Sequence, residues 1–355
     1  MAQRSRQEGP RARSRPAPGS RLALLGCVLA LAVVALGAFT RLVDAGLGCP
    51  DWPGCYGHLL WPRADHEVMQ ANASFPDMPV DHDKTWPEMI HRYLAGGLGL
   101  LVAALALVAW RHRRRRGQPF RLPLLLLALV VAQALLGMWT VTLRLWPQVV
   151  VAHLLGGLLT LTLLALLTQR LFHLRWRLTL PELGRLHSLR PWLWLALLMT
   201  LVQIALGGWT TANYAAVACP DLPTCQGRWL PAMDLAQGFD LFHRPGPSHL
   251  GGRLDNEARV AIHYSHRLGA LLTLIAVGTL CALLWWRAGF AAARRMAALL
   301  GTLLLVQLAL GLANVLLHFP VWVAVAHNLG AALLLVTLAS LAHRVHTATP
   351  HSEGG

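Results

Sequence analysis

The chain has 355 residues, of which 55% are hydrophobic and only 13% are charged. Its mean hydropathy of +0.48 excludes an ordinary soluble globular protein, because one water-soluble core cannot bury so much apolar surface. The formal net charge of +15 comes from short arginine blocks between apolar runs. Membrane topology explains these blocks better than nucleic-acid binding does, so we expect membrane lipid and no nucleic acid as partners.

Eight apolar runs are long enough to cross a bilayer as α-helices. In chain order they occupy residues 22–40, 89–110, 122–143, 148–169, 191–210, 260–286, 294–317 and 321–342. The first run follows a basic tail, as the apolar part of a signal peptide would. We keep it as a membrane helix because the internal repeat described below requires it.

The basic residues predict the orientation of these helices. Of the 31 Lys and Arg residues, 21 lie in the N-terminal tail, after the second, fourth and sixth runs, or after the last run. By the positive-inside rule these segments are cytoplasmic, and so are both termini. We therefore expect a multi-pass protein of the cell inner (plasma) membrane, with two long outer loops at 41–87 and 211–259.

The chain contains an internal repeat of four helices. C-P-D-W-P-G-C at 49–55 returns as C-P-D-L-P-T-C at 219–225, an offset of 170 residues. The pairs His91-Arg92 and His266-Arg267, and the segments A-H-L-L-G-G at His153 and A-H-N-L-G-A at His327, repeat at nearly the same offset. The sequence thus predicts an all-α integral membrane protein of eight transmembrane helices, arranged as two pseudo-symmetric four-helix bundles of the same orientation.

This repeat sets the expected domain organisation. It comprises a cytoplasmic basic tail (1–21), an N-terminal half (22–170), a cytoplasmic linker (171–190), a C-terminal half (191–343) and a cytoplasmic tail (344–355). Glycine-centred segments recur at 34–40, 133–140, 203–210 and 307–314, where small residues permit close helix packing. Gln133, Gln203 and Gln307 in these segments either bind a ligand or make interhelical contacts, and we favour the contacts.

Four histidines carry the main functional signal. His91, His153, His266 and His327 begin the even-numbered helices at the outer side, two in each half. A single histidine there would be an ordinary packing residue, but two pairs at matched depth are suited to axial ligation of haem iron inside a bundle. A zinc or di-iron site is disfavoured because the spans nearly lack acidic residues.

Other residues near the histidines have two interpretations each. Arg92 and Arg267 either contact haem propionates or anchor the helices at the interface. Glu88 either lies beside a haem, three residues before His91, or belongs to a capping box in T-W-P-E at 85–88. His263 stands at the matching place in the second half. The glycines that follow the histidines either leave room for a flat macrocycle or pack helices; they are Gly96, Gly97, Gly156, Gly157, Gly269 and Gly330.

Four cysteines lie in the outer loops. Because that side is oxidising in bacteria, we expect the disulfides Cys49–Cys55 and Cys219–Cys225, with redox or thiol-transfer chemistry as the alternative. Cys27 and Cys281 lie within apolar helices and are expected to be inert packing residues.

Together these features resemble the haem A synthase family. The resemblance rests on the duplicated halves, C-P-D-W-P-x-C in the first outer loop, E-x-x-H-R at Glu88 to Arg92, and the paired A-H-x-x-G segments. It covers nearly the whole chain and is closest to bacterial members with cysteine pairs in both halves. The family oxidises the C8 methyl group of haem O, through a hydroxylated intermediate, to the formyl group of haem A, which terminal oxidases use.

The resemblance also implies roles for individual residues. His91 and His153 would bind the substrate haem O, His266 and His327 would ligate the iron of a haem b cofactor, and Glu88 would be the catalytic carboxylate. Haem O synthase and terminal oxidase assembly proteins would be partners, and the chain could form a homo-oligomer. The alternatives are a dihaem cytochrome b that only transfers electrons, and a haem carrier or transporter. The difference between Glu88 and His263 favours the synthase, because electron transfer alone needs no such carboxylate.

Overall fold

The structure is a computed structural model of the chain that describes residues 16–242 and 254–351. Within these residues, eight helices are long and apolar enough to cross a membrane. They are α1 (Ser20–Leu42), α3 (His82–Arg111), α4 (Arg121–Thr142), α5 (Pro147–Leu171), α7 (Arg190–Ala212), α9 (Asn256–Ala282) with its π-helical continuation η1 (Leu283–Ala288), α10 (Ala291–Leu316) and α11 (Val321–Thr347). The prediction of an all-α membrane protein with eight spans is confirmed.

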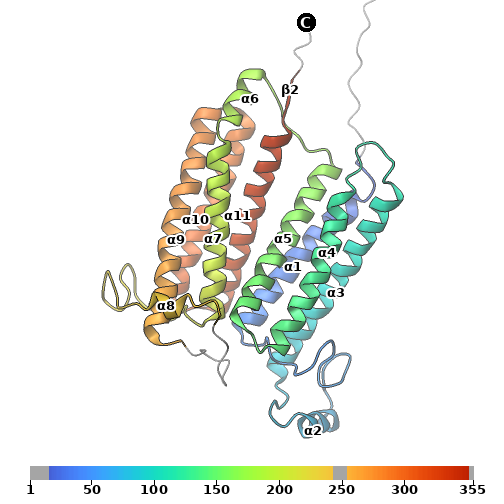
Figure 1. Ribbon diagram of the computed structural model, residues 1–355, viewed down its shortest axis with the longest axis vertical. Coiled ribbons are helices and arrows are strands. Elements are labelled where there is room, and N and C mark those ends of the chain that lie inside the picture. The colour runs from blue at the N-terminus through green and yellow to red at the C-terminus, as the bar shows by residue number, and fades with distance from the viewer. Residues whose placement is uncertain (1–15, 243–253, 352–355) are drawn as a thin grey trace, which may run out of the picture.

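Each half of the chain forms a four-helix bundle. In the first half, neighbouring helices in the closed order α1, α3, α4, α5 pack together, and in the second half α7, α9, α10 and α11 do the same. The halves stand side by side and meet through α1 and α5 on one side and α7 and α11 on the other (Figure 1). The two-fold relation between the halves stays a prediction.

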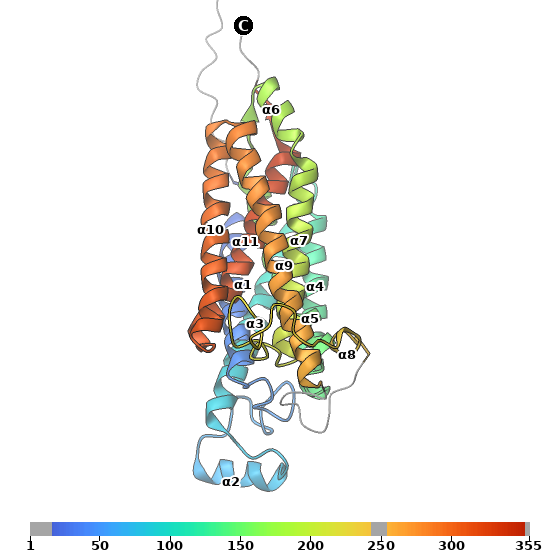
Figure 2. The same ribbon diagram turned by 90° about the vertical axis from the view of Figure 1, so that its left-hand side faces the viewer.

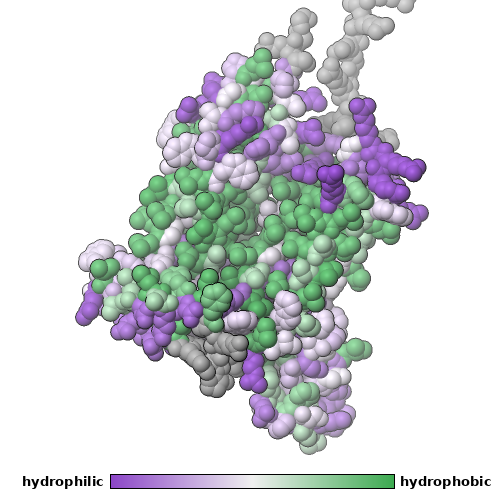
Figure 3. Space-filling model, viewed as in Figure 1, coloured by the Kyte–Doolittle hydropathy of each residue, from purple (hydrophilic) through white to green (hydrophobic). Residues whose placement is uncertain are grey.

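The apolar helices present a continuous hydrophobic belt to the surroundings. Figure 3 shows apolar residues over the middle of the molecule and polar residues toward both ends. Large apolar side chains in this belt are exposed, for example Leu100 at 77% and Leu305 at 64%. Such exposure suits lipid, which these side chains would contact without any loss of hydrophobic stabilisation.

The two ends of the molecule differ. One end, here called the disulfide end, carries both disulfides and the short helices α2 (Asp65–Ser74) and α8 (Leu235–Gly238). The opposite end, here called the basic end, carries α6 (Leu180–His187) and a parallel pair of two-residue strands, β1 (Arg177–Leu178) and β2 (Thr349–Pro350) (Figures 1 and 2). The segment expected to be a plain linker, 171–190, therefore contains β1 and α6.

Several helices extend beyond their apolar runs. The apolar run at 89–110 lies within α3, which begins earlier, at His82, where the side chain of Asp81 accepts a hydrogen bond from the backbone N–H of Asp83. This cap gives the helix a polar start outside the apolar run. At the other terminus, α11 continues to Thr347, so residues 344–347 belong to the helix and not to a tail.

Candidate functional site

The four candidate ligand histidines all lie toward the disulfide end of their helices, on α3, α5, α9 and α11. In the first half, the rings of His91 and His153 have centroids 6.4 Å apart and planes at 88°. An imidazole nitrogen binds a transition metal at about 2 Å and lies about 1 Å from its ring centre, so two axial ligands of one ion have centroids about 6 Å apart. The observed separation therefore fits a shared haem iron.

Buried ring nitrogens supply a second test of this fit. The Nδ1 atoms of His91, His153 and His327 are buried, and none has a hydrogen-bond partner among the described residues. Buried polar atoms normally have partners, so such atoms are free to interact with a bound group. Both histidines of the first half are thus suited to a bound haem, whereas in the second half Nδ1 of His266 already lies 3.1 Å from Gln203 Nε2.

The glutamines of the glycine-centred segments contact the neighbouring helix. Gln203 on α7 donates from Nε2 to the backbone oxygen of His266 at 3.0 Å, and the same nitrogen lies 3.1 Å from Nδ1 of that ring. Gln307 Nε2 on α10 lies 3.3 Å from Nε2 of His327 on α11. Gln203 and Gln307 therefore make interhelical contacts, which is the interpretation that we favoured. The residues that they contact are the candidate ligands His266 and His327.

The glycines that follow the histidines divide into two kinds. Gly156, Gly269 and Gly330 lie directly against the side chains of Gln133, Gln203 and Gln307, respectively. Gly96 and Gly97, which follow His91, have open space where a Cβ atom would be. The space beside the first three is therefore filled by glutamine, whereas Gly96, Gly97 and Gly157, whose added Cβ atom would lie 4.0 Å from Gln133 Oε1, leave room.

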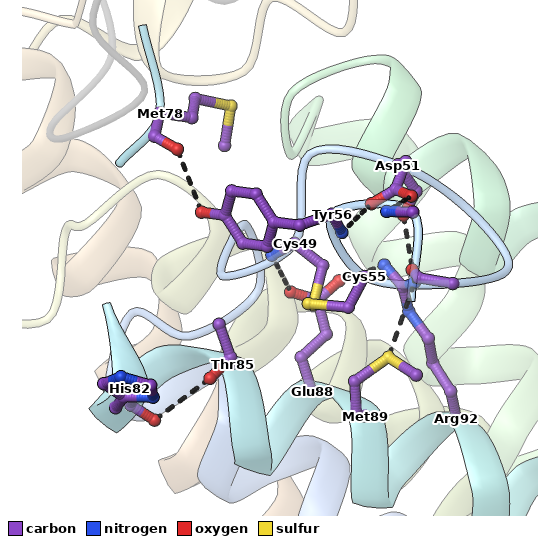
Figure 4. The surroundings of a disulfide bond; sticks show 12 residues. Cys49, Asp51, Cys55, Tyr56, Met78, His82, Thr85, Glu88, Met89 and Arg92 are labelled. Atoms are coloured by element: carbon purple, nitrogen blue, oxygen red, sulfur yellow. Dashed lines mark hydrogen bonds and ion pairs between the residues drawn. A yellow bond between two sulfur atoms is a disulfide. The ribbon is translucent and has the colours of Figure 1, made fainter. Parts of the chain in front are cut away.

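Glu88 is buried, with 5% of its surface exposed, and is bonded on both sides (Figure 4). Its Oε2 accepts a hydrogen bond from the backbone N–H of Cys49 at 3.0 Å, and its Oε1 lies 2.5 Å from Nη2 of Arg92. The capping-box interpretation of 85–88 is wrong, because α3 starts at His82 and Glu88 lies within it. Its structural role is to anchor the first disulfide loop.

The second half has a different group at this position. His263 is also buried, at 4% exposed, and its ring centroid lies 6.5 Å from that of Phe319. An imidazole cannot accept two hydrogen bonds as the Glu88 carboxylate does. The two sites therefore differ chemically, as the sequence predicted.

Arg92 and Arg267 clamp the two disulfide loops. Arg92 Nη1 donates to the backbone oxygens of Asp51 at 3.0 Å and Gly54 at 2.5 Å. Arg267 donates to the backbone oxygens of Thr224 at 2.8 Å and Cys219 at 2.7 Å. Sequence reasoning missed these contacts, although the arginines repeat together with the cysteine loops. A contact with haem propionates stays a prediction.

Both expected disulfides are present, Cys49–Cys55 and Cys219–Cys225, whereas Cys27 and Cys281 are free. In each loop the aspartate of C-P-D accepts hydrogen bonds from the two backbone N–H groups that follow the second cysteine. Asp51 bonds Tyr56 and Gly57 at 2.6 and 2.8 Å, and Asp221 bonds Gln226 and Gly227 at 2.6 and 3.0 Å. Hydrogen bonds, first that from the Thr224 hydroxyl, lower the pKa of Asp221 to about 2.

Tyr56 packs under the first disulfide loop. Its hydroxyl donates to the backbone oxygen of Met78 at 3.0 Å (Figure 4). Burial, and then the charges of Asp81, Glu88 and Asp51, raise the pKa of Tyr56 to about 12. The phenol therefore stays protonated and keeps its hydrogen bond between the disulfide loop and the backbone of Met78.

Comparison with known proteins gives a consistent result. The family model described as COX15-CtaA, cytochrome oxidase assembly protein, matches residues 20–339. The chain is 45% identical to the "Heme A synthase" of Shewanella oneidensis over 315 residues, which are 88% of this chain and 92% of that protein. It is 30% identical to that of Rhizorhabdus wittichii over 347 residues, or 90% and 92% of the two chains, and 28% identical to that of Erythrobacter litoralis over 343 residues, or 90% and 95%. The chain therefore belongs to the COX15-CtaA family of cytochrome oxidase assembly proteins.

Proposed function

We propose that this protein is a haem A synthase, which oxidises the C8 methyl group of haem O to a formyl group through a hydroxylated intermediate. The family match and the similarity to proteins named "Heme A synthase" support this activity. The structural observation that supports the activity is the close approach of the His91 and His153 rings, with the buried carboxylate of Glu88 three residues before His91.

In this proposal the two halves have different tasks. His91 and His153 bind haem O as the substrate in the half formed by 22–170, and His266 and His327 hold haem b in the half formed by 191–343. When bound, haem b supplies one-electron redox chemistry. Haem O synthase supplies the substrate, and assembly partners of terminal oxidases receive the haem A.

The reaction proceeds in two stages of equal electron count. The methyl group and water give the alcohol, two electrons and two protons, and the alcohol gives the aldehyde with two more electrons and two more protons. The electrons pass to an external electron acceptor. Two histidine ligands would leave no open position on the substrate iron for oxygen, so in this proposal the oxygen atom added to the oxidised methyl carbon comes from water.

Glu88 serves this chemistry as a charge stabiliser or proton acceptor. Its carboxylate is fixed by the Cys49 N–H and by Arg92, so it needs no reorganisation when positive charge develops beside it. A positioned carboxylate can also take the proton that water releases. The buried His263 in the second half offers no negative charge, which suits a site that only holds a cofactor.

The orientation is part of the proposal. With both termini in the cytoplasm of a cell with an inner membrane, the disulfide end faces the oxidising side, which agrees with the disulfides there. The arginines of the basic end then face the cytoplasm, as the positive-inside rule requires.

Extraction of the haems tests the function directly. The protein is produced in cells that make haem O, purified, and its haems are separated by chromatography. We expect haem O together with hydroxylated and formyl haems. A cytochrome that only transfers electrons, or a haem carrier, would give unmodified haems alone, and that result would overturn the proposal.

A further inference from the structure

Each candidate ligand histidine lies against a glycine of the preceding spanning helix. A methyl group added to Gly37 on α1 would lie 2.8 Å from Cε1 of His91, and one added to Gly207 on α7 would lie 3.1 Å from Cε1 of His266. For Gly311 on α10 and His327 the distance is 3.2 Å. For Gly137 on α4 and His153 it is 3.5 Å, an ordinary van der Waals contact.

This pairing is specific to the histidines. The four glycines stand at matching places in the glycine-centred segments, as V-A-L-G at Gly37, A-L-L-G at Gly137, I-A-L-G at Gly207 and L-A-L-G at Gly311. Other glycines of the same bundles do not face an imidazole: a methyl group on Gly26 or Gly208 would meet leucine side chains, and one on Gly278 or Gly301 would meet nothing within 4 Å among the described residues. Close helix packing alone does not explain why every one of the four segments places its glycine on an imidazole ring.

We propose that Gly37, Gly207 and Gly311 are positioning residues that seat the imidazoles of His91, His266 and His327. The contact is made at Cε1, the carbon between the two ring nitrogens, so a side chain at the glycine would displace both nitrogens together. The inference rests on the proposed function only for the identity of the group that these nitrogens bind. Gly137 is outside this set because a methyl group at Gly137 would fit against the His153 ring.

The contacts predict an order of sensitivity. A Cβ atom at 2.8 Å from His91 forces the ring or the helix to move, whereas 3.1 and 3.2 Å demand shifts of a few tenths of an ångström. Gln203 and Gln307 also hold the rings of His266 and His327. Val33 stands where the first segment would have its glutamine, so no glutamine side chain holds the His91 ring, which is hydrogen-bonded to the backbone of Val33 instead. We therefore expect the largest effect at Gly37.

The first test compares alanine variants of the purified protein with bound haem. Gly37→Ala is matched by Gly137→Ala, which adds the same methyl group opposite the other histidine of the same pair. Gly207→Ala tests the second half, and Gly301→Ala reports on alanine in a spanning helix away from any histidine. The readouts are haem content per protein and the absorption spectrum in the oxidised and reduced states.

We expect Gly37→Ala to weaken haem binding in the first half by about 10-fold to 100-fold, the range found when groups that orient metal ligands are changed. Gly207→Ala should weaken or spectrally shift the haem of the second half by a smaller factor. Gly137→Ala and Gly301→Ala should match the parent. Parental spectra and haem content in Gly37→Ala and Gly207→Ala would overturn the inference.

A second test does not depend on haem. In haem-free protein, Gly37→Ala should lower the unfolding temperature, and adding His91→Ala should remove that loss, because no ring is left to clash. Gly137→Ala and His153→Ala should instead be additive. Additivity at Gly37 and His91 would overturn the inference. If the parental protein binds no haem, the proposed function is overturned. The comparison of single and double variants would still show whether Gly37 packs against His91.

Discussion

Glu88 combines two tasks at the scale of a single residue. It anchors the loop closed by Cys49–Cys55, and it places a carboxylate one helical turn from His91. The Arg92 guanidinium serves the same loop and neutralises part of the Glu88 charge at 2.5 Å. Any experiment on Glu88 must therefore separate loss of chemistry from loss of the loop.

Comparison of Glu88→Gln with Arg92→Gln distinguishes loss of chemistry from loss of the loop structure. Gln at position 88 can still accept the Cys49 hydrogen bond but has no charge and little basicity, so haem A yield should fall by about 100-fold or more while haem b is retained. Arg92→Gln breaks the same ion pair but leaves the carboxylate, so it should retain much more activity. Chromatography of extracted haems at equal protein level measures both. Equal loss in the two variants would show that Glu88 acts only through the loop.

The histidines predict a division between the halves. In the proposed assignment His266→Ala and His327→Ala each remove one axial ligand, so we expect either change to abolish or weaken the binding of haem b. His91→Ala and His153→Ala should keep the haem b spectrum but yield no haem A. Spectra of the purified variants, taken with haem extraction, test this. Normal haem b in both second-half variants would contradict the assignment.

The sequence predicted the ligand candidates but not what holds them. Two matched histidine pairs and the cysteine loops could be found because they repeat at a constant offset. The hydrogen bonds that Cys49 N–H donates to Glu88 and that Arg92 donates to the loop carbonyls join positions about 40 residues apart without any local periodicity. The contact between Gly37 and His91 was also hidden, because a glycine in a membrane helix is equally explained by helix packing.

At the scale of elements, the two disulfide loops are the same device used twice. An aspartate bonds the amides after the second cysteine, and an arginine from the following helix holds carbonyls of the loop. The spans themselves were predictable from apolar runs. The polar first turns of α3 and α9 were not, because hydropathy does not register a helix that continues beyond the lipid.

The clamp on the second loop can be tested without activity. Hydrogen bonds to charged groups contribute about 1.5–3 kcal/mol each, so Arg267→Gln should let the loop open more often. We expect the Cys219–Cys225 bond to be reduced several-fold faster by a phosphine reductant in the purified protein. Mass spectrometry of alkylated peptides follows both bonds, and Cys49–Cys55 in the same molecule is the control. Equal rates before and after the change would show that Arg267 does not hold the loop.

At the scale of the whole molecule, the halves are tied together near both ends. At the disulfide end, Arg41 of α1 donates to the backbone oxygen of Thr211 at 2.7 Å and lies 4.3 Å from the ring centroid of Tyr214, whose hydroxyl bonds Asp44 at 3.0 Å. Toward the basic end, Gln169 of α5 donates to Ser340 of α11 at 2.8 Å. Because the candidate ligand histidines of both halves lie toward the disulfide end of their helices, we expect both pairs on the same side of the membrane.

Labelling of single cysteines can show on which side of the membrane the disulfide end lies. In a background with Cys27→Ala and Cys281→Ala, single cysteines are placed at two exposed positions, Gln70 on α2 at the disulfide end and His112 at the basic end. If both termini are cytoplasmic, a maleimide that cannot cross membranes should label Gln70→Cys in cells whose outer envelope has been made permeable. It should label His112→Cys only after the inner membrane is opened. The arginines at 111 and 113–116 are the physical reason, because moving such a block across the membrane during insertion is unfavourable. Labelling of His112→Cys before the membrane is opened would reverse the orientation and place both haem sites on the reducing side, where the two disulfides would not persist.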